Sequence, residues 1–142
     1  MNKPACFVAT VALIAGFGLT DARAEMITLK ADLKGSNEVP PNSSPGSGKA
    51  EATLDTVTKV LTWTIAYKDL SGPVVGAHFH GPSEPGKNAG IVLPFKTVEK
   101  SPIQGSATLS DAQIADLLAG KWYANIHTAA NPGGELRGNM VK

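Results

Sequence analysis

The chain has 142 residues, of which 42% are hydrophobic, and it carries 13 basic residues against 12 acidic ones. This composition is typical of an ordinary globular domain, and the length is enough for one hydrophobic core. The nearly balanced charge argues against a nucleic-acid partner, because such partners normally require a basic surface.

Residues 1–24 have the pattern of a signal peptide that is cleaved during secretion. Lys3 supplies a positive start, an apolar run follows at residues 7–19, and small residues surround Arg23 at the expected cleavage position. The apolar run is shorter than the roughly 20 residues that span a bilayer. Cleavage removes Cys6 and leaves residues 25–142 as a single domain without cysteine. We therefore predict a periplasmic or secreted protein that has no disulfide and binds no membrane after cleavage.

The first part of this domain alternates between apolar and polar residues, which is the pattern of half-buried strands. Such strands are predicted at residues 27–33, 49–55 and 61–67, with a loop rich in proline, serine and glycine at 42–48. A short turn at residues 56–59 joins the last two strands, which are therefore expected to form a hairpin.

The next strand ends at His80 and is followed by a long loop, residues 81–90, that is rich in glycine and proline. Loops of this length in a compact domain are more often functional than short ones. Residues 91–95 are predicted to be an edge strand because they include Pro94, and residues 103–109 a further strand.

The one predicted helix begins at Ser110, where Gln113 completes a capping box, and ends at Gly120. Strands at residues 122–127 and 135–141 complete the domain. Several short strands joined by turns, with one small helix, indicate an all-β fold of antiparallel strands, either a sandwich or a barrel.

Two histidines lie close together on one predicted strand. Side chains two residues apart on a strand share a face, so His78 and His80 project together while Val75, Ala77 and Phe79 point to the opposite face. Because the residues of that opposite face are apolar or small, we expect it to lie against the core. The two imidazoles then lie on the outer side of the sheet, where a loop can cover them.

The third histidine, His127, shares the outer face of a later strand with Tyr123 and Asn125. If the strands are neighbours, His78, His80 and His127 can converge on one metal ion, since neutral imidazole is a good ligand for copper, zinc, iron and nickel. Copper is the first choice by the affinity order of divalent metals, and zinc is the alternative. The competing interpretation is that the three rings only form hydrogen bonds with loop backbone.

Three motifs stand out in this domain. They are LKGSNEVPP at residues 33–41, AHFHGP at residues 77–82, and NIHT with NPGGELRG at residues 125–128 and 131–138. Together they resemble the chordin-type (CHRD) domain family. Their order and spacing cover essentially all of residues 25–142. The resemblance implies an extracytoplasmic β-sandwich, and the family has no single established reaction.

A weaker resemblance is to the copper site of copper/zinc superoxide dismutase, where an H-x-H strand and a later histidine hold copper outside a Greek-key barrel. It implies roles for His78, His80 and His127 as copper ligands. Arg137 would then guide an anion. The chain departs from that pattern because it has too few histidines for a second metal and lacks the disulfide. The fold that we expect is an antiparallel Greek-key sandwich or barrel, either immunoglobulin-like or superoxide-dismutase-like.

Two charged residues are candidates for supporting the metal site. Glu38, stiffened by the prolines after it, can accept a hydrogen bond from a histidine ring and fix its tautomer, or can be a solvated loop acid. Arg137 can attract an anion, or can pair with Glu135 or Glu38.

The leading hypothesis is a periplasmic or secreted protein that binds copper for copper handling or electron transfer, with a periplasmic or extracellular protein as a possible partner. One alternative is a copper-dependent redox enzyme of the superoxide dismutase type. The other is a metal-free extracellular module for protein interaction. No arrangement typical of a hydrolase stands out, so no catalytic residue is assigned.

Overall fold

The computed structural model describes residues 25–142, so the predicted signal peptide lies outside the described residues. The described chain forms eight strands, one short 3-10 helix and one α-helix. The elements are β1 (Met26–Lys34), η1 (Gly35–Asn37), β2 (Ser47–Asp55), β3 (Val60–Lys68), β4 (Val74–His80), β5 (Ile91–Pro94), β6 (Ile103–Thr108), α1 (Asp111–Leu118), β7 (Tyr123–Thr128) and β8 (Leu136–Asn139).

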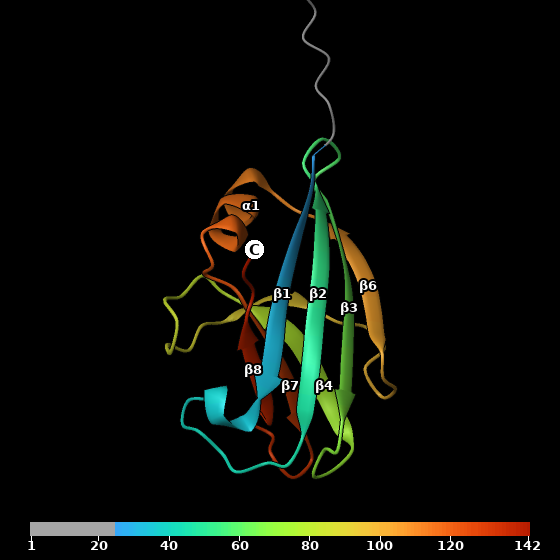
Figure 1. Ribbon diagram of the computed structural model, residues 1–142, viewed down its shortest axis with the longest axis vertical. Coiled ribbons are helices and arrows are strands. Elements are labelled where there is room, and N and C mark those ends of the chain that lie inside the picture. Colours follow the sequence, from blue (N-terminus) through green and yellow to red (C-terminus); the bar gives the residue numbers. More distant parts are fainter. Residues whose placement is uncertain (1–24) are drawn as a thin grey trace, which may run out of the picture.

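All eight strands belong to one antiparallel sheet with the order β5-β4-β7-β8-β1-β2-β3-β6. The sheet curls into a half-barrel, with β1, β2 and β3 in front of β4 and β7 (Figure 1). Strand β8 returns to lie beside β1, so the last strand of the chain joins the half that contains β4 and β7 to the half that contains β1, β2 and β3. The predicted all-β fold with one short helix is confirmed.

The core fills the space between the two halves of the curled sheet. Trp63 of β3 lies edge-on to Phe79 of β4, with ring centroids 5.6 Å apart, and Phe95 packs within 5.1 Å of both rings. Ala77 and Phe79 are almost fully buried, as the alternation in this strand predicts. The imidazoles of the same strand therefore belong to the outer face.

The predicted edge strand and helix are both present. Strand β5, with Pro94, forms one edge of the sheet, and β6 forms the other. Helix α1 begins with the capping box of Ser110 and Gln113, and Gly120 follows it with a φ of 73° that favours glycine. No helix in the described part of the chain is long and apolar enough to cross a membrane.

Val75 does not face the core, and the prediction that it does was wrong. Its side chain is 60% exposed. The pairing of β4 with β7 shifts register between Val74 and Gly76, so the strict alternation holds only from Gly76 onwards. An irregularity of this kind adds a residue to one strand and turns its side chain out of the pattern.

Candidate metal centre

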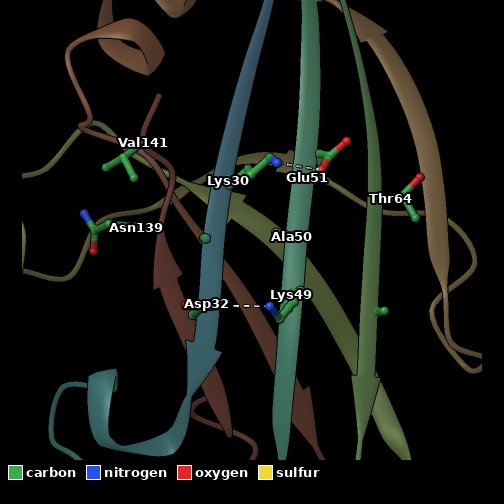
Figure 2. Close-up of a pocket in the computed structure, with 10 residues that line it drawn as sticks. Lys30, Asp32, Lys49, Ala50, Glu51, Thr64, Asn139 and Val141 are labelled. Atoms are coloured by element: carbon green, nitrogen blue, oxygen red, sulfur yellow. Dashed lines mark ion pairs between the residues drawn. The ribbon is translucent and has the colours of Figure 1, made fainter.

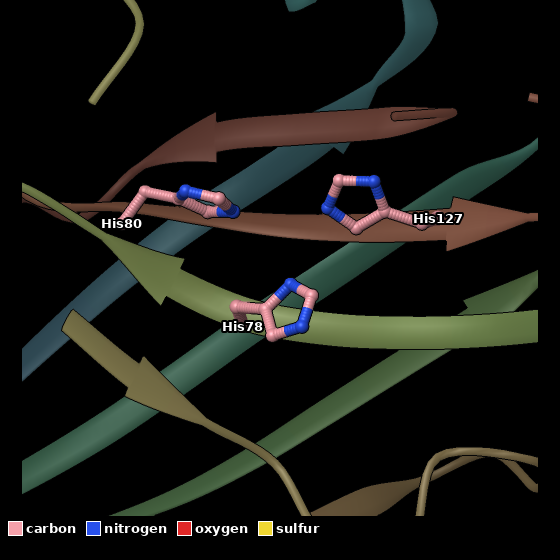
Figure 3. A group of neighbouring side chains, drawn as sticks. All are labelled: His78, His80 and His127. Atoms are coloured by element: carbon pink, nitrogen blue, oxygen red, sulfur yellow. The ribbon is translucent and has the colours of Figure 1, made fainter. Parts of the chain in front are cut away.

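The three histidines meet on the outer face of the sheet. Strands β4 and β7 are neighbours, so His78 and His80 lie beside His127 although almost fifty residues separate them in the chain. The ring centroids are 5.0 to 5.9 Å apart, and one ligand nitrogen of each ring lies within 4.8 Å of the other two. Figure 3 shows one nitrogen of each ring turned towards the space between them.

Backbone carbonyls fix the tautomers of two of these rings. Nδ1 of His80 lies 3.0 Å from the carbonyl oxygen of Ala89, and Nδ1 of His127 lies 3.0 Å from that of Pro132. A carbonyl oxygen only accepts, so each Nδ1 carries the hydrogen and each Nε2 keeps a free lone pair. Both Nε2 atoms are buried without a hydrogen-bond partner. This is the arrangement that orients a histidine for metal binding.

His78 completes the cluster with a nitrogen that also lacks a partner, its buried Nδ1. Burial, reinforced by the nearby rings of His127 and His80, lowers the pKa of His78 to about 4. Burial also lowers the pKa of His80, and the positive charge of Arg137 contributes to that shift. At neutral pH both side chains are therefore in the uncharged form that binds metal.

The pKa of His78 can be tested directly in the metal-free protein. Between pH 6.5 and about 4 the unfolded chain protonates this ring and the folded chain does not, so His78 favours unfolding as the pH falls through that window. We expect the ring signal of His78 in an NMR titration to show its midpoint near pH 4. A midpoint near pH 6.5 would mean that the ring is solvated, not buried.

The loop at residues 81–90 covers the cluster at His80. The ring of Tyr123 is stacked on that of His80, with centroids 4.9 Å apart and planes only 2° from parallel. The Tyr123 hydroxyl accepts a hydrogen bond from the Ala89 amide and donates one to its carbonyl oxygen. His80 is consequently only 8% exposed, whereas His78 and His127 remain partly accessible.

Arg137 lies on Tyr123 and not at the histidines. Its guanidinium carbon is 3.6 Å from the centroid of the Tyr123 ring, and the side chain is buried. It donates to the carbonyl oxygen of Lys87 at 2.6 Å and to Oδ1 of Asn88 at 2.8 Å. The four ion pairs of residues 25–142 are all made by lysines. Arg137 thus holds the covering loop and forms no ion pair with Glu38 or Glu135.

Glu38 is buried and accepts its hydrogen bond from the side-chain amide of Asn125, not from a histidine. Burial raises the pKa of Glu38 to about 7, although Asn125 and Arg137 act in the opposite direction. Gly134 has a φ of 133°, and a Cβ there would come within 2.8 Å of the Glu38 carboxylate oxygens. The glycine is required by both its conformation and this close approach.

Replacing Glu38 with glutamine is expected to stabilise the protein at high pH. The folded state binds the proton of Glu38 more tightly than the unfolded state, so the stability contributed by the neutral carboxyl is present below pH 4.5 and lost as the pH rises through about 7. We expect Glu38→Gln to raise the free energy of unfolding by about 2 kcal/mol at pH 8.5 and by much less at pH 5. Urea unfolding at the two pH values measures the difference, and equal effects at both would contradict the raised pKa.

A surface depression lies away from the histidines, on the outer face of β1, β2 and β3 (Figure 2). Two exposed ion pairs cross it, Lys30 with Glu51 at 3.4 Å and Lys49 with Asp32 at 3.9 Å. Exposed pairs of this kind contribute little energy, and the lining residues include no histidine. The histidine cluster is the stronger candidate for a functional site.

A family model, described as CHRD domain, matches residues 29–140. The chain belongs to the CHRD domain family. All three histidines and both charged candidates, Glu38 and Arg137, lie inside the matched part of this CHRD domain, so the family resemblance noted in the sequence is confirmed. Comparison of the chain with curated proteins found no match, and comparison with solved structures found none.

Sequence reasoning assigns no role to Tyr123, Asn125 or Asn88, although the alternation in β7 does predict the face on which the first two lie. Tyr123 and Asn125 alternate with His127 and so were expected on its face, where they contact His80 and Glu38. Asn88 belongs to the loop, whose conformation no pattern of alternation describes.

Proposed function

We propose that this CHRD-domain protein binds one copper ion through His78, His80 and His127, outside the cytoplasm, for copper handling or electron transfer. The proposal rests on one observation, the three neighbouring rings whose partnerless nitrogens point into a common space. Copper is preferred over zinc because a site built only of imidazole follows the affinity order of divalent metals.

The spacing of the nitrogens suits a metal ion after a small adjustment. Two imidazole nitrogens at about 2.1 Å from one ion are at most about 4.2 Å apart. The ligand atoms of His78, His80 and His127 lie within 4.8 Å of one another, so small side-chain rotations bring them to binding distance. The hydrogen bonds to Ala89 and Pro132 limit the cost of ordering two of the rings.

Copper handling is a better fit to the geometry than an enzyme of the superoxide dismutase type. In such an enzyme the arginine attracts an anion to the metal, whereas here the Tyr123 ring lies between Arg137 and His80. The guanidinium is also buried and already donates to Lys87 and Asn88. We therefore assign no substrate and no catalytic residue.

The test is a copper titration of the purified protein, followed by metal analysis after dialysis and by an electron paramagnetic resonance spectrum. We expect one copper per chain, coupling to nitrogen nuclei in the spectrum, and displacement of zinc by copper in competition. Protein that retains no copper would overturn the proposal and leave the metal-free interaction module.

A further inference from the structure

A positive charge is buried next to the proposed copper site. Strand β7 lies between β4 and β8, so Tyr123 separates His80 of β4 from Arg137 of β8. The Tyr123 ring stacks on the parallel ring of His80, and the guanidinium carbon of Arg137 lies 3.6 Å from the centroid of the same Tyr123 ring. Arg137 is 1% exposed, so water screens its charge poorly.

No opposite charge neutralises this guanidinium in an ion pair. Its hydrogen bonds go to the neutral oxygens of Lys87 and Asn88, and the four ion pairs of residues 25–142 involve other residues. The buried carboxyl of Glu38 bonds to Asn125 instead, and its raised pKa keeps it largely neutral at mildly acid pH.

We propose that Arg137, held against Tyr123, is a positioning residue that biases the copper site towards Cu(I). This inference rests on the proposed function. Reduction of Cu(II) adds one electron to the ion and lowers its charge from +2 to +1, which relieves repulsion from a nearby fixed cation. Three imidazoles offer no thiolate or thioether that would favour Cu(I) by softness, so the fixed charge is the device that sets the preference.

The size of the bias follows from the separation of the charges. Reduction removes one unit of positive charge from the copper ion, about 10 Å from the unit charge of Arg137. At an effective dielectric constant near 20, the lost repulsion changes the equilibrium between Cu(II) and Cu(I) by roughly tenfold. Tenfold for a one-electron couple corresponds to about 59 mV of reduction potential.

The sharpest variant neutralises the cation without removing a buried side chain. Asn88 is exposed and its Oδ1 already accepts from Arg137, so Asn88→Asp places a carboxylate on the guanidinium with almost no change in shape, and it removes the hydrogen bond that Asn88 donates to the Val39 carbonyl oxygen. The matched control is Gln104→Glu, which adds the same charge at an exposed position of β6, at the other edge of the sheet.

Cu(I) and Cu(II) affinities are measured at pH 6 by competition with chelators specific for each ion, with ascorbate supplying the electron for the Cu(I) series. We expect Asn88→Asp to lower the ratio of Cu(I) to Cu(II) affinity about tenfold, and Gln104→Glu to change it less than twofold. Equal ratios for these two variants would overturn the inference.

A second pair of variants separates charge from structure at the arginine itself. We expect Arg137→Gln to lower the affinity ratio as Asn88→Asp does, and Arg137→Lys to retain the ratio of the unaltered protein. A fall of equal size in both Arg137 variants would show a structural role only and overturn the inference. Unaltered protein that binds neither ion would instead refute the copper site itself, so the two failures are distinguishable.

Discussion

Replacing His80 or His127 with asparagine is expected to lower copper affinity by at least about 100-fold and to leave the fold intact. Loss of a group that only orients a ligand typically costs 10- to 100-fold in metal affinity, and these changes remove a ligand itself. Asparagine carries an N–H donor at the position of Nδ1, so the hydrogen bond to Ala89 or Pro132 is retained while Nε2 disappears.

The choice of asparagine is important at His80 because this ring is more than a surface ligand. It is 8% exposed, bonds to the covering loop and stacks on Tyr123. His80→Ala deletes both contacts, and we expect it to lower the free energy of unfolding by about 1 to 2 kcal/mol. His80→Asn is expected to cost less, so circular dichroism and thermal unfolding of the two variants separate loss of the ligand from loss of packing.

Tyr123→Phe is the matched control for these histidine variants. It removes the hydroxyl that bonds to Ala89 but no candidate ligand, so it is expected to keep stoichiometric copper. Unchanged copper affinity in both asparagine variants would exclude the cluster as the binding site. Loss of copper in Tyr123→Phe as well would show that an ordered loop, not the ligand count, decides binding.

Much of the site is visible in the sequence because strand alternation assigns faces. The spacing of His78 and His80 places both on one face, and Ala77 and Phe79 bury the other, as the structure confirms. That His127 joins them depends on the pairing of β4 with β7, which alternation alone does not specify. The metal remains a prediction from the donor set.

The parts that the sequence does not reveal depend on backbone geometry. The carbonyl oxygens of Ala89 and Pro132 fix two tautomers, and every residue type has a carbonyl. The exposure of Val75 follows from a register shift that no residue in the strand signals. Glu135 is a third case, since its charge suggested a pair with Arg137 but its carboxylate accepts bonds from hydroxyl groups.

Glu135 fastens three separate segments of the chain through one fully buried carboxylate. Oε1 accepts from the hydroxyl of Ser44 and from the amide and hydroxyl of Ser71, and Oε2 accepts from the hydroxyl of Thr128. Burial alone would raise the pKa of Glu135, but these hydrogen bonds together lower it to about 2. The carboxylate is thus strongly favoured in its ionised form.

Glu135→Gln is expected to lower the free energy of unfolding by about 3 kcal/mol at pH 7, because the new amide group turns its hydrogens towards hydroxyls that were donating. Chemical denaturation measures this change. The exposed Glu84→Gln serves as the control and is expected to stay within about 0.5 kcal/mol of the unaltered protein.

The pH dependence of that loss distinguishes the buried carboxylate from a simple packing defect. Glu135 has a lower pKa in the folded state, so its contribution is fully present above pH 4.5 and disappears as the pH falls towards about 2. The difference in free energy of unfolding between Glu135→Gln and the unaltered protein should therefore become smaller as the pH falls from 4.5 towards about 2. A difference that stays constant would contradict the role assigned to the charge.

The same substitution is also expected to weaken copper binding. Thr128 follows His127 in the chain and accepts a hydrogen bond from the Asn131 amide, which orders the turn that presents the Pro132 carbonyl to the His127 ring. If Thr128 loses its bond to Glu135, the turn is less ordered and the ring of His127 is held less firmly. We therefore expect a loss of roughly tenfold in copper affinity. Full affinity in a destabilised but folded Glu135→Gln protein would show that the turn holds His127 without help from this carboxylate.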